Sequence, residues 1–204
     1  MINQYRSLII IFFLVFVLGC KTDKVPVKGE TAWQKKMNNQ FKDASTSPLT
    51  EADLKSFNGL DFFDQDSLFI VNAVLERTPE SEWFDMKTTT DRLSKERIYG
   101  IARFELQGAS YQLNIYQGQE HLETEGMENY LFLPFLDLTN GESTYGGGRY
   151  LDLTIPKGDS LVIDFNKSYN PYCVYNEKYS CPLVPRENFI ALEVKAGMKT
   201  YKSD

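Results

Sequence analysis

The chain has one histidine, His121, and three cysteines among its 204 residues. A structural zinc site needs about four ligands, and two C-terminal thiols with one distant histidine do not supply them. We therefore expect no metal and no cofactor. Basic residues are also in the minority, with 22 Lys and Arg against 28 Asp and Glu. The sequence thus lacks the basic surface needed to bind nucleic acid.

No apolar run is long enough to span a membrane. The longest, Leu8–Leu18, falls short of the roughly 20 residues of a transmembrane helix. It follows Arg6 and precedes Gly19 and Cys20. A basic residue, a short apolar segment and a small residue before a cysteine are typical of an export signal. The final Val-Leu-Gly-Cys resembles the lipobox of bacterial lipoproteins, which implies cleavage before Cys20 and lipidation of its thiol.

The alternative is an ordinary secretory signal that ends beside a cysteine. Lipidation is favoured because three thiols leave one unpaired in an oxidising compartment, whereas an anchor at Cys20 leaves Cys173 and Cys181 as a pair. We therefore predict a cell-envelope protein anchored to a membrane by lipid, facing the periplasm or the cell surface. Its parts would be a signal peptide at 1–19, a flexible tether at 20–30 and one domain at 31–204, since no repeat indicates a second domain.

Two short helices are expected at the start of the domain. Thr31–Gln34 fits a capping box, and Met37 and Phe41 follow at four-residue spacing on one helical face. Thr50–Asp53 is typical of a second helix start, and Asn58-Gly59 tolerates a left-handed stop.

From Ser67 onward, apolar and polar residues alternate with period two, which indicates about seven short strands. The expected strands are 67–77, 98–106, 111–117, 130–138, 150–155, 161–165 and 189–196. Pro134 predicts an edge or a bulge in its strand because proline has no amide hydrogen. The expected fold class is mainly β (α+β), an antiparallel sheet curled into a partial barrel or sandwich with the two helices packed on it.

Unusual sequence motifs are concentrated between Asp137 and Asn188. They are Thr-Tyr-Gly-Gly-Gly-Arg-Tyr-Leu at 144–151, Asp-Phe-Asn at 164–166 and Tyr-Asn-Pro-Tyr-Cys at 169–173. Together with Lys-Thr-Thr-Thr-Asp-Arg at 87–92, they resemble the bacterial domain of unknown function 1684 family, over a region from Leu49 to Met198. The resemblance implies a shared fold and a shared C-terminal cluster, but no reaction.

Arg149 follows three glycines as a planar set of hydrogen-bond donors. It is expected either to bind a carboxylate or phosphate on a ligand, or to pair internally with an acidic residue of the segment. The glycines alone do not indicate a phosphate site, because the Lys-Ser/Thr ending of a P-loop is missing. The ligand-binding candidates are Asp137, Thr144, Tyr145, Arg149, Asp164, Asn166, Tyr169, Asn170, Glu187 and Asn188.

Several of these candidates have a structural alternative. Asn166, Asn170 and Asn188 stand beside turn residues, where asparagine commonly holds loop backbone. The tyrosines of the segment are interpreted either as an aromatic platform for a glycan or peptide, or as ordinary core residues. They are Tyr145, Tyr150, Tyr169, Tyr172, Tyr175 and Tyr179.

Cys173 and Cys181 close a small loop, and outside the cytoplasm we expect them to form a disulfide. Nucleophilic thiol chemistry is the disfavoured alternative, since His121 is far away in sequence.

The preferred function is a binding or structural module. Its recognition surface would be the hairpin with Arg149 and the Tyr-Asn-Pro-Cys loop, and its ligand a small molecule, glycan or peptide. The alternative is a hydrolase-like enzyme in which Arg149 stabilises negative charge beside a carboxylate. The candidate carboxylates are Asp137, Glu142, Asp164 and Glu187. The sequence indicates no oligomeric state.

Overall fold

The computed structural model describes residues 30–201. The expected signal peptide, the lipidation site Cys20 and nearly all of the expected tether lie outside the described residues. Within residues 30–201, no helix has the length and apolar character needed to cross a membrane.

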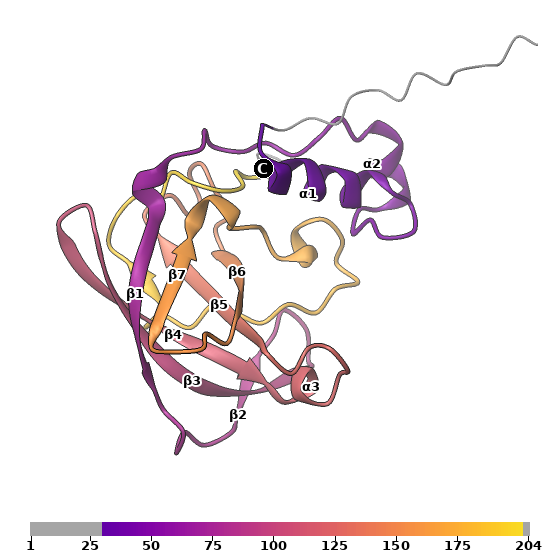
Figure 1. Ribbon diagram of the computed structural model, residues 1–204. Helices are drawn as coiled ribbons and strands as arrows, with labels where there is room; N and C mark the ends of the chain where they lie inside the picture. Colours follow the sequence, from indigo (N-terminus) through magenta and orange to yellow (C-terminus); the bar gives the residue numbers. More distant parts are fainter. Residues whose placement is uncertain (1–29, 202–204) are drawn as a thin grey trace, which may run out of the picture.

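The fold is a sheet of eight strands curled into a half-barrel, so the expected fold class is confirmed (Figure 1). Six strands follow the order β6-β5-β4-β3-β1-β7, while β2 pairs with β3 and β8 pairs in parallel with β5. The strands are β1 (Ile70–Arg77), β2 (Phe84–Lys87), β3 (Leu93–Leu106), β4 (Ala109–Gly118), β5 (Tyr130–Asp137), β6 (Arg149–Thr154), β7 (Ser160–Asp164) and β8 (Phe189–Ile190).

Two N-terminal helices lie together at one end of the half-barrel, α1 (Ala32–Lys42) and α2 (Glu51–Ser56) (Figure 1). The capping box before α1 is confirmed, because Thr31 and Gln34 exchange hydrogen bonds between side chain and backbone. Phe41 is buried on the inner face of α1, with its ring centroid 4.7 Å from that of Tyr175. The sequence patterns did not indicate β2 or the one-turn helix α3 (Gln119–Leu122).

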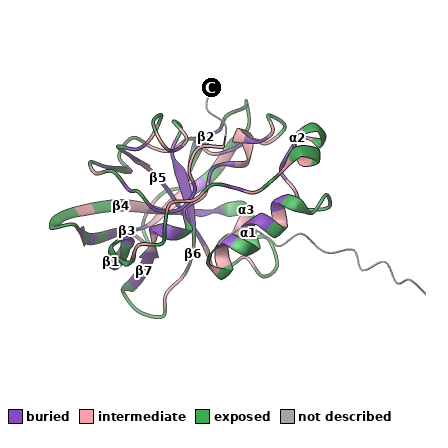
Figure 2. Ribbon diagram, turned by 90° about the horizontal axis from the view of Figure 1, so that it is seen from above, coloured by how far each residue is buried: buried purple, intermediate pink, exposed green. Residues whose placement is uncertain are grey.

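The sheet buries side chains on both faces (Figure 2). The main core lies on one face and includes Leu75, Ile115, Leu133 and Ile163. The other face of β3 to β6 is covered by the segment 169–184, which we call the covering segment. Beneath it are Met86, Tyr116, Phe132 and Tyr150, which form one buried cluster with Cys181 of the covering segment. This second face also holds the side chains of Glu96, Tyr130 and Asp152, which are described below.

Pro134 lies inside the sheet, so β5 is not the edge strand that the proline allowed. β4 and β5 form a single residue pair, and beside Pro134 the side chain of Asn188 takes the place of further pairing. Its Nδ2 donates to the carbonyls of Pro134 at 2.7 Å and Asn114 at 2.8 Å, while its Oδ1 accepts from the Asn114 amide at 2.9 Å. One side chain thus pairs with three backbone groups between β4 and β5.

The strand expected at 189–196 is correct only at Phe189 and Ile190. Beyond them the carbonyls of Val194 and Ala196 accept hydrogen bonds from Arg149, so this backbone is paired with a side chain rather than with a strand.

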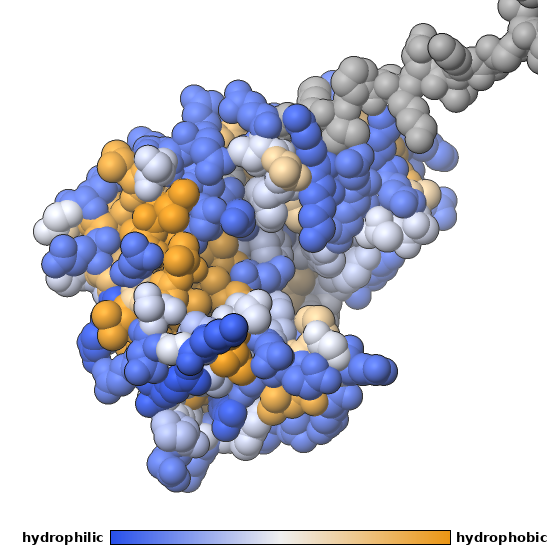
Figure 3. All heavy atoms as spheres, viewed as in Figure 1, coloured by the Kyte–Doolittle hydropathy of each residue, from blue (hydrophilic) through white to orange (hydrophobic). Residues whose placement is uncertain are grey.

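Apolar side chains are exposed on the outer side of β1 and β7, where hydrophobic residues gather in Figure 3. Ile70, Val74 and Val162 contribute to this stripe. Nothing in residues 30–201 shows what covers it.

Candidate functional site

Arg149 and Asp137 form an ion pair in the interior, with both side chains fully buried and 2.6 Å between Nη2 and Oδ2. Nη2 also donates to the Val194 carbonyl at 2.8 Å, and Nη1 donates to the Ala196 carbonyl. Burial lowers the pKa of Arg149, and the charge of Asp137 opposes that shift. The guanidinium therefore holds the C-terminal segment against β6, and internal pairing, one of the two arrangements left open by the sequence, is the one observed.

The triple glycine allows the backbone at the start of β6 to lie close to that of β5. Gly148 has φ +90°, and a Cβ there would lie 2.6 Å from the Phe135 carbonyl. Gly146 and Gly147 are exposed and do not have positive φ. The turn therefore requires glycine at position 148, where β6 begins next to β5.

Thr144 and Tyr145 belong to a compact turn. The buried Thr144 hydroxyl lies 2.8 Å from that of Thr139, and Asn140 Nδ2 donates to the Tyr145 carbonyl at 3.1 Å. Thr139 also donates to Asp137 through its amide, at 2.7 Å. The turn is therefore connected to the buried ion pair.

The asparagine candidates hold backbone. Asn166 exchanges hydrogen bonds with the backbone of Asp66, at 2.8 and 2.9 Å, and Asn170 Nδ2 donates to the Lys199 carbonyl at 2.9 Å. Asp164 accepts from the Asn166 amide and forms an ion pair with Lys167 at 3.1 Å. These contacts match the structural alternative for the asparagines.

The four candidate carboxylates do not converge on Arg149. Asp137 is its buried partner, Asp164 pairs with Lys167, and Glu142 and Glu187 are exposed side chains. The arrangement gives no support to hydrolysis by a carboxylate beside Arg149.

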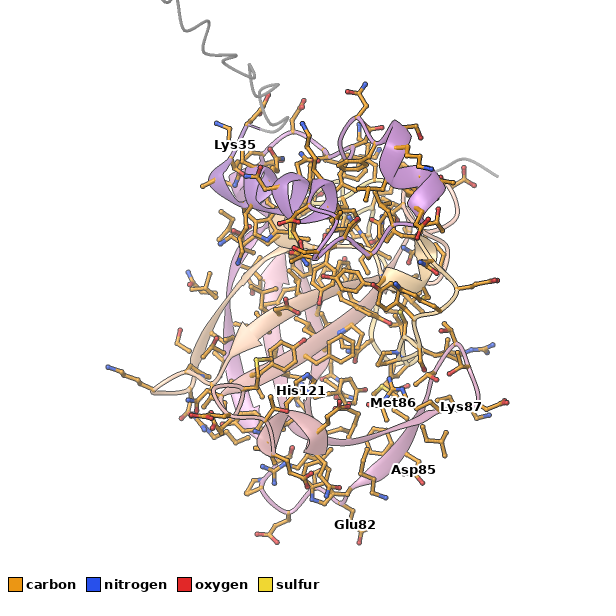
Figure 4. All side chains as sticks on the ribbon, turned by 90° about the vertical axis from the view of Figure 1, so that its right-hand side faces the viewer. Lys35, Glu82, Asp85, Met86, Lys87 and His121 are labelled. Carbon is orange, nitrogen blue, oxygen red and sulfur yellow. The ribbon has the colours of Figure 1, made fainter. Side chains whose placement is uncertain are left out.

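A different group of polar side chains lies on the second face of the sheet. It consists of Glu96 from β3, Tyr116 from β4, His121 from α3, Tyr130 from β5, Asp152 from β6 and Tyr169 from the covering segment. We call it the tyrosine–carboxylate site. His121 lies in the lower half of Figure 4, at the height of Met86 and well below Lys35 of α1. Figure 3 shows the surface indented between α1 and α3.

Glu96 is the buried acid of this site, with 3% of its surface exposed. Its Oε1 accepts from the Ser94 hydroxyl at 2.7 Å, whereas its buried Oε2 has no hydrogen-bond partner. Burial raises the pKa of Glu96, and the hydrogen bond from Ser94 and the charge of Arg92 only partly offset that effect.

His121 places a second unpartnered atom beside Glu96. Its buried Nδ1 has no hydrogen-bond partner, and its ring centroid lies 4.4 Å from that of Tyr130. Burial lowers the pKa of His121, which favours the neutral imidazole. A Cβ on Gly118 would lie 2.8 Å from Nδ1 and 3.1 Å from the nearer Glu96 oxygen. Only glycine at this position lets the two side chains keep their places.

Asp152 is the solvent-exposed acid of the site. It accepts hydrogen bonds from the hydroxyls of Tyr130, at 2.9 Å, and Tyr169. Burial and the nearby charge of Asp152 raise the pKa of Tyr130 and Tyr169, so both stay donors. Burial also raises the pKa of Tyr116 to about 12. The Tyr116 hydroxyl lies near Asn114 but outside hydrogen-bonding geometry, and it has no partner.

Cys173 and Cys181 lie side by side in the covering segment. Both are free thiols in this structure, and the Cys173 amide donates to Cys181 Sγ at 3.1 Å. Their proximity is compatible with the disulfide expected from the sequence, which stays a prediction.

Sequence reasoning did not single out most of the tyrosine–carboxylate site. Tyr169 was a candidate, and His121 was considered only as a metal ligand and as a distant base for a thiol. One signal was present, because Glu96 stands two residues before Ile98, on the strand face expected to be buried. An acidic residue at such a position is unusual and marks a site worth attention.

Two surface hollows lie elsewhere. One, of about 590 Å³, is lined by residues that include Phe63, Gln107 and Lys195. The other, of about 710 Å³, is lined by residues that include Asn72, Arg103 and Gln112. Neither has the unpartnered buried atoms of the tyrosine–carboxylate site.

Comparison with known proteins agrees with the family resemblance that the sequence motifs indicated. The family described as "Protein of unknown function (DUF1684)" matches residues 55–199, a range that contains the whole tyrosine–carboxylate site as well as Cys173 and Cys181. Among solved structures, the solution NMR structure of an uncharacterized protein of Haloarcula marismortui is 31% identical in sequence, with a TM-score of 0.64. The match covers 82% of this chain and 90% of that one. No curated protein matches.

Proposed function

This chain belongs to the DUF1684 family, and we propose that it is a binding protein that recognises a small polar ligand at the tyrosine–carboxylate site. One observation carries the proposal. Within residues 30–201, three of the five buried side-chain polar atoms without a hydrogen-bond partner belong to this site, on Glu96, Tyr116 and His121. Buried polar groups are nearly always paired, and each unpaired one costs about 1–3 kcal/mol.

The chemistry of the site indicates the kind of ligand. Glu96 and Asp152 are hydrogen-bond acceptors, and tyrosine rings line the space near them. A sugar or a small amine offers the donors that such acceptors need, together with carbon surface that packs on aromatic rings. The ligand class therefore agrees with the small molecule, glycan or peptide expected from the sequence. The proposed binding site differs from the recognition surface expected from the sequence. Arg149 is buried and is not part of it, whereas Tyr169 of the Tyr-Asn-Pro-Cys loop belongs to both.

The proposal includes the location in the cell. Cys20 would carry the lipid anchor, and residues 20–30 would tether the domain to a membrane of the cell envelope, facing the periplasm or the cell surface. The export-type N-terminus and the lipobox-like Val-Leu-Gly-Cys support this. Metabolic labelling with a fatty acid, compared between the natural chain and Cys20→Ser, tests it. Label on both proteins, or Cys20→Ser still processed and retained in the detergent-soluble envelope fraction, would contradict the anchor.

The binding proposal is tested by a substitution that displaces the side chains of Glu96 and His121. Gly118 has φ −84°, so alanine is compatible with its backbone, but the new methyl group would contact both side chains. Gly158→Ala is the matched control, because a Cβ there meets nothing within 4 Å.

Thermal shift should be measured with a set of monosaccharides, disaccharides, short peptides and organic amines. We expect at least one class to stabilise the natural chain and Gly158→Ala, and to have no effect on Gly118→Ala. A set without any stabilising compound, or compounds that stabilise all three proteins equally, would refute the proposal.

A further inference from the structure

Cys173 and Cys181 form a pair of thiols outside the proposed ligand site. Cys173 is partly exposed, and Cys181 is buried directly behind it. The Cys173 amide donates to Cys181 Sγ at 3.1 Å, so the two residues lie within reach of a bond between their sulfurs. With one accessible and one enclosed thiol, the first can attack a disulfide that arrives from solvent, and the second can then complete the exchange.

The enclosed thiol is held firmly by Thr89, which follows β2. Thr89 donates its amide to the Cys181 carbonyl at 2.9 Å and accepts from the Cys181 amide through Oγ1 at 3.1 Å. The next residue, Pro182, accepts a hydrogen bond from the Tyr150 hydroxyl. Cys181 therefore keeps its place while the more exposed Cys173 reacts.

We propose that Cys173 and Cys181 form a redox-active dithiol, in which Cys173 attacks an external disulfide and Cys181 resolves the resulting mixed disulfide. This activity is independent of the ligand proposed above. Its substrates are molecules with an accessible disulfide bond, such as small disulfides or the disulfides of proteins.

The reaction is a two-step exchange with a disulfide RS–SR. The Cys173 thiolate attacks one sulfur of RS–SR, forming Cys173–S–S–R and releasing RS⁻. The Cys181 thiolate then attacks Cys173 Sγ, which forms the Cys173–Cys181 bond and releases the second RS⁻. The dithiol loses two electrons and two protons, and RS–SR gains both to become two RSH.

The surroundings of the thiols favour this order. Hydrogen bonds from the Cys181 thiol and the Thr89 hydroxyl stabilise the Cys173 thiolate and lower the pKa of Cys173 to about 7. The same contact with Cys173 raises the pKa of Cys181. Once Cys173 is in the mixed disulfide it bears no charge, so this obstacle to ionising Cys181 is removed.

The test uses the reduced full chain carrying Cys20→Ser, so that only two thiols respond. The probe is the aromatic disulfide 5,5′-dithiobis(2-nitrobenzoate), whose released thiolate is coloured. We expect two released thiolates per chain and no retained adduct. Adding Cys181→Ser should give one released thiolate and one adduct that maps to Cys173. Adding Cys173→Ser instead should slow the reaction at least tenfold.

The pH dependence separates an activated thiol from an ordinary one. In the Cys181→Ser chain the serine hydroxyl replaces the Cys181 thiol as a hydrogen-bond donor to Cys173. The rate of adduct formation in this chain should therefore reach half its maximum well below the ordinary thiol pKa of about 8.5. Thr89→Val should move that midpoint upward, whereas Thr46→Val, at an exposed position, should not. Circular dichroism and thermal unfolding verify that each variant folds. If Cys173→Ser does not fold, the Cys181→Ser chain decides alone, through the position of its adduct and its pH midpoint.

Three results would overturn the proposal. They are two adducts retained on the parent chain, an adduct on Cys181→Ser that forms with a midpoint near 8.5, and equal rates for Cys173→Ser and the parent chain.

Discussion

Arg149 donates to Asp137 across 2.6 Å at a place where neither side chain is exposed. Removing one partner of such a pair leaves a buried charge without compensation. The two residues connect β5, β6 and the C-terminal segment. The pair therefore stabilises the region that contains most of the family's sequence motifs.

Asp137→Asn should therefore lower the free energy of unfolding by about 3–5 kcal/mol. Glu76→Gln is the control, because it removes another arginine–carboxylate pair, 3.1 Å to Arg103, in which both side chains are exposed. That control should change stability by less than about 1 kcal/mol. Urea unfolding measures both, and similar losses in the two variants would contradict the structural role of the buried pair.

Asn188→Ala should also destabilise the protein. The change leaves the carbonyls of Pro134 and Asn114 and the Asn114 amide without their partner, at a cost of about 1–3 kcal/mol for each group that stays unpaired. Asn72→Ala, on the exposed side of β1, is the comparison and should be within about 0.5 kcal/mol of the natural chain. Thermal and urea unfolding supply the values. An Asn188→Ala chain as stable as Asn72→Ala would show that the sheet closes without this side chain.

The two ends of the triple glycine should differ in their tolerance of alanine. Gly148→Ala adds a side chain at φ +90° and only 2.6 Å from the Phe135 carbonyl, which costs at least about 1–3 kcal/mol. At Gly146 the nearest atom to an added Cβ is 3.7 Å away, an ordinary contact. The melting temperature should fall clearly for Gly148→Ala and change little for Gly146→Ala. The reverse order would mean that the turn is built differently.

Glu96 should make stability fall as pH rises. Its pKa is raised in the folded protein, so over the interval between the unfolded and folded pKa values the native state binds more protons than the unfolded state. Stability from this group is complete below the ordinary pKa of 4.5 and is lost as pH rises through the raised value. Glu96→Gln should remove this dependence of the free energy of unfolding on pH. Compared with the natural chain, the variant should therefore be relatively more stable at neutral pH than at acidic pH.

Glu105→Gln, an exposed change on the same strand, serves as its control. Urea unfolding between pH 4 and 8 gives the comparison. A slope that survives in Glu96→Gln would place its origin in another group.

The sequence by itself determined the local structure of this protein. The capping box at Thr31 and Gln34 and the period-two alternation of the strands act between near neighbours, so they can be recognised in a short stretch. The family was also recognisable, because each of its motifs consists of consecutive residues.

The tertiary structure decided what the polar residues do. Arg149 was compatible with a ligand or an internal partner, and only the return of the C-terminal segment, some 45 residues later, brought the Val194 carbonyl to it. Glu96, His121 and Asp152 are brought together by strand register and by a one-turn helix, neither of which has a local sequence signature. Burial and pairing depend on which distant segments pack together, and that is a property of the whole fold rather than of any one stretch of sequence.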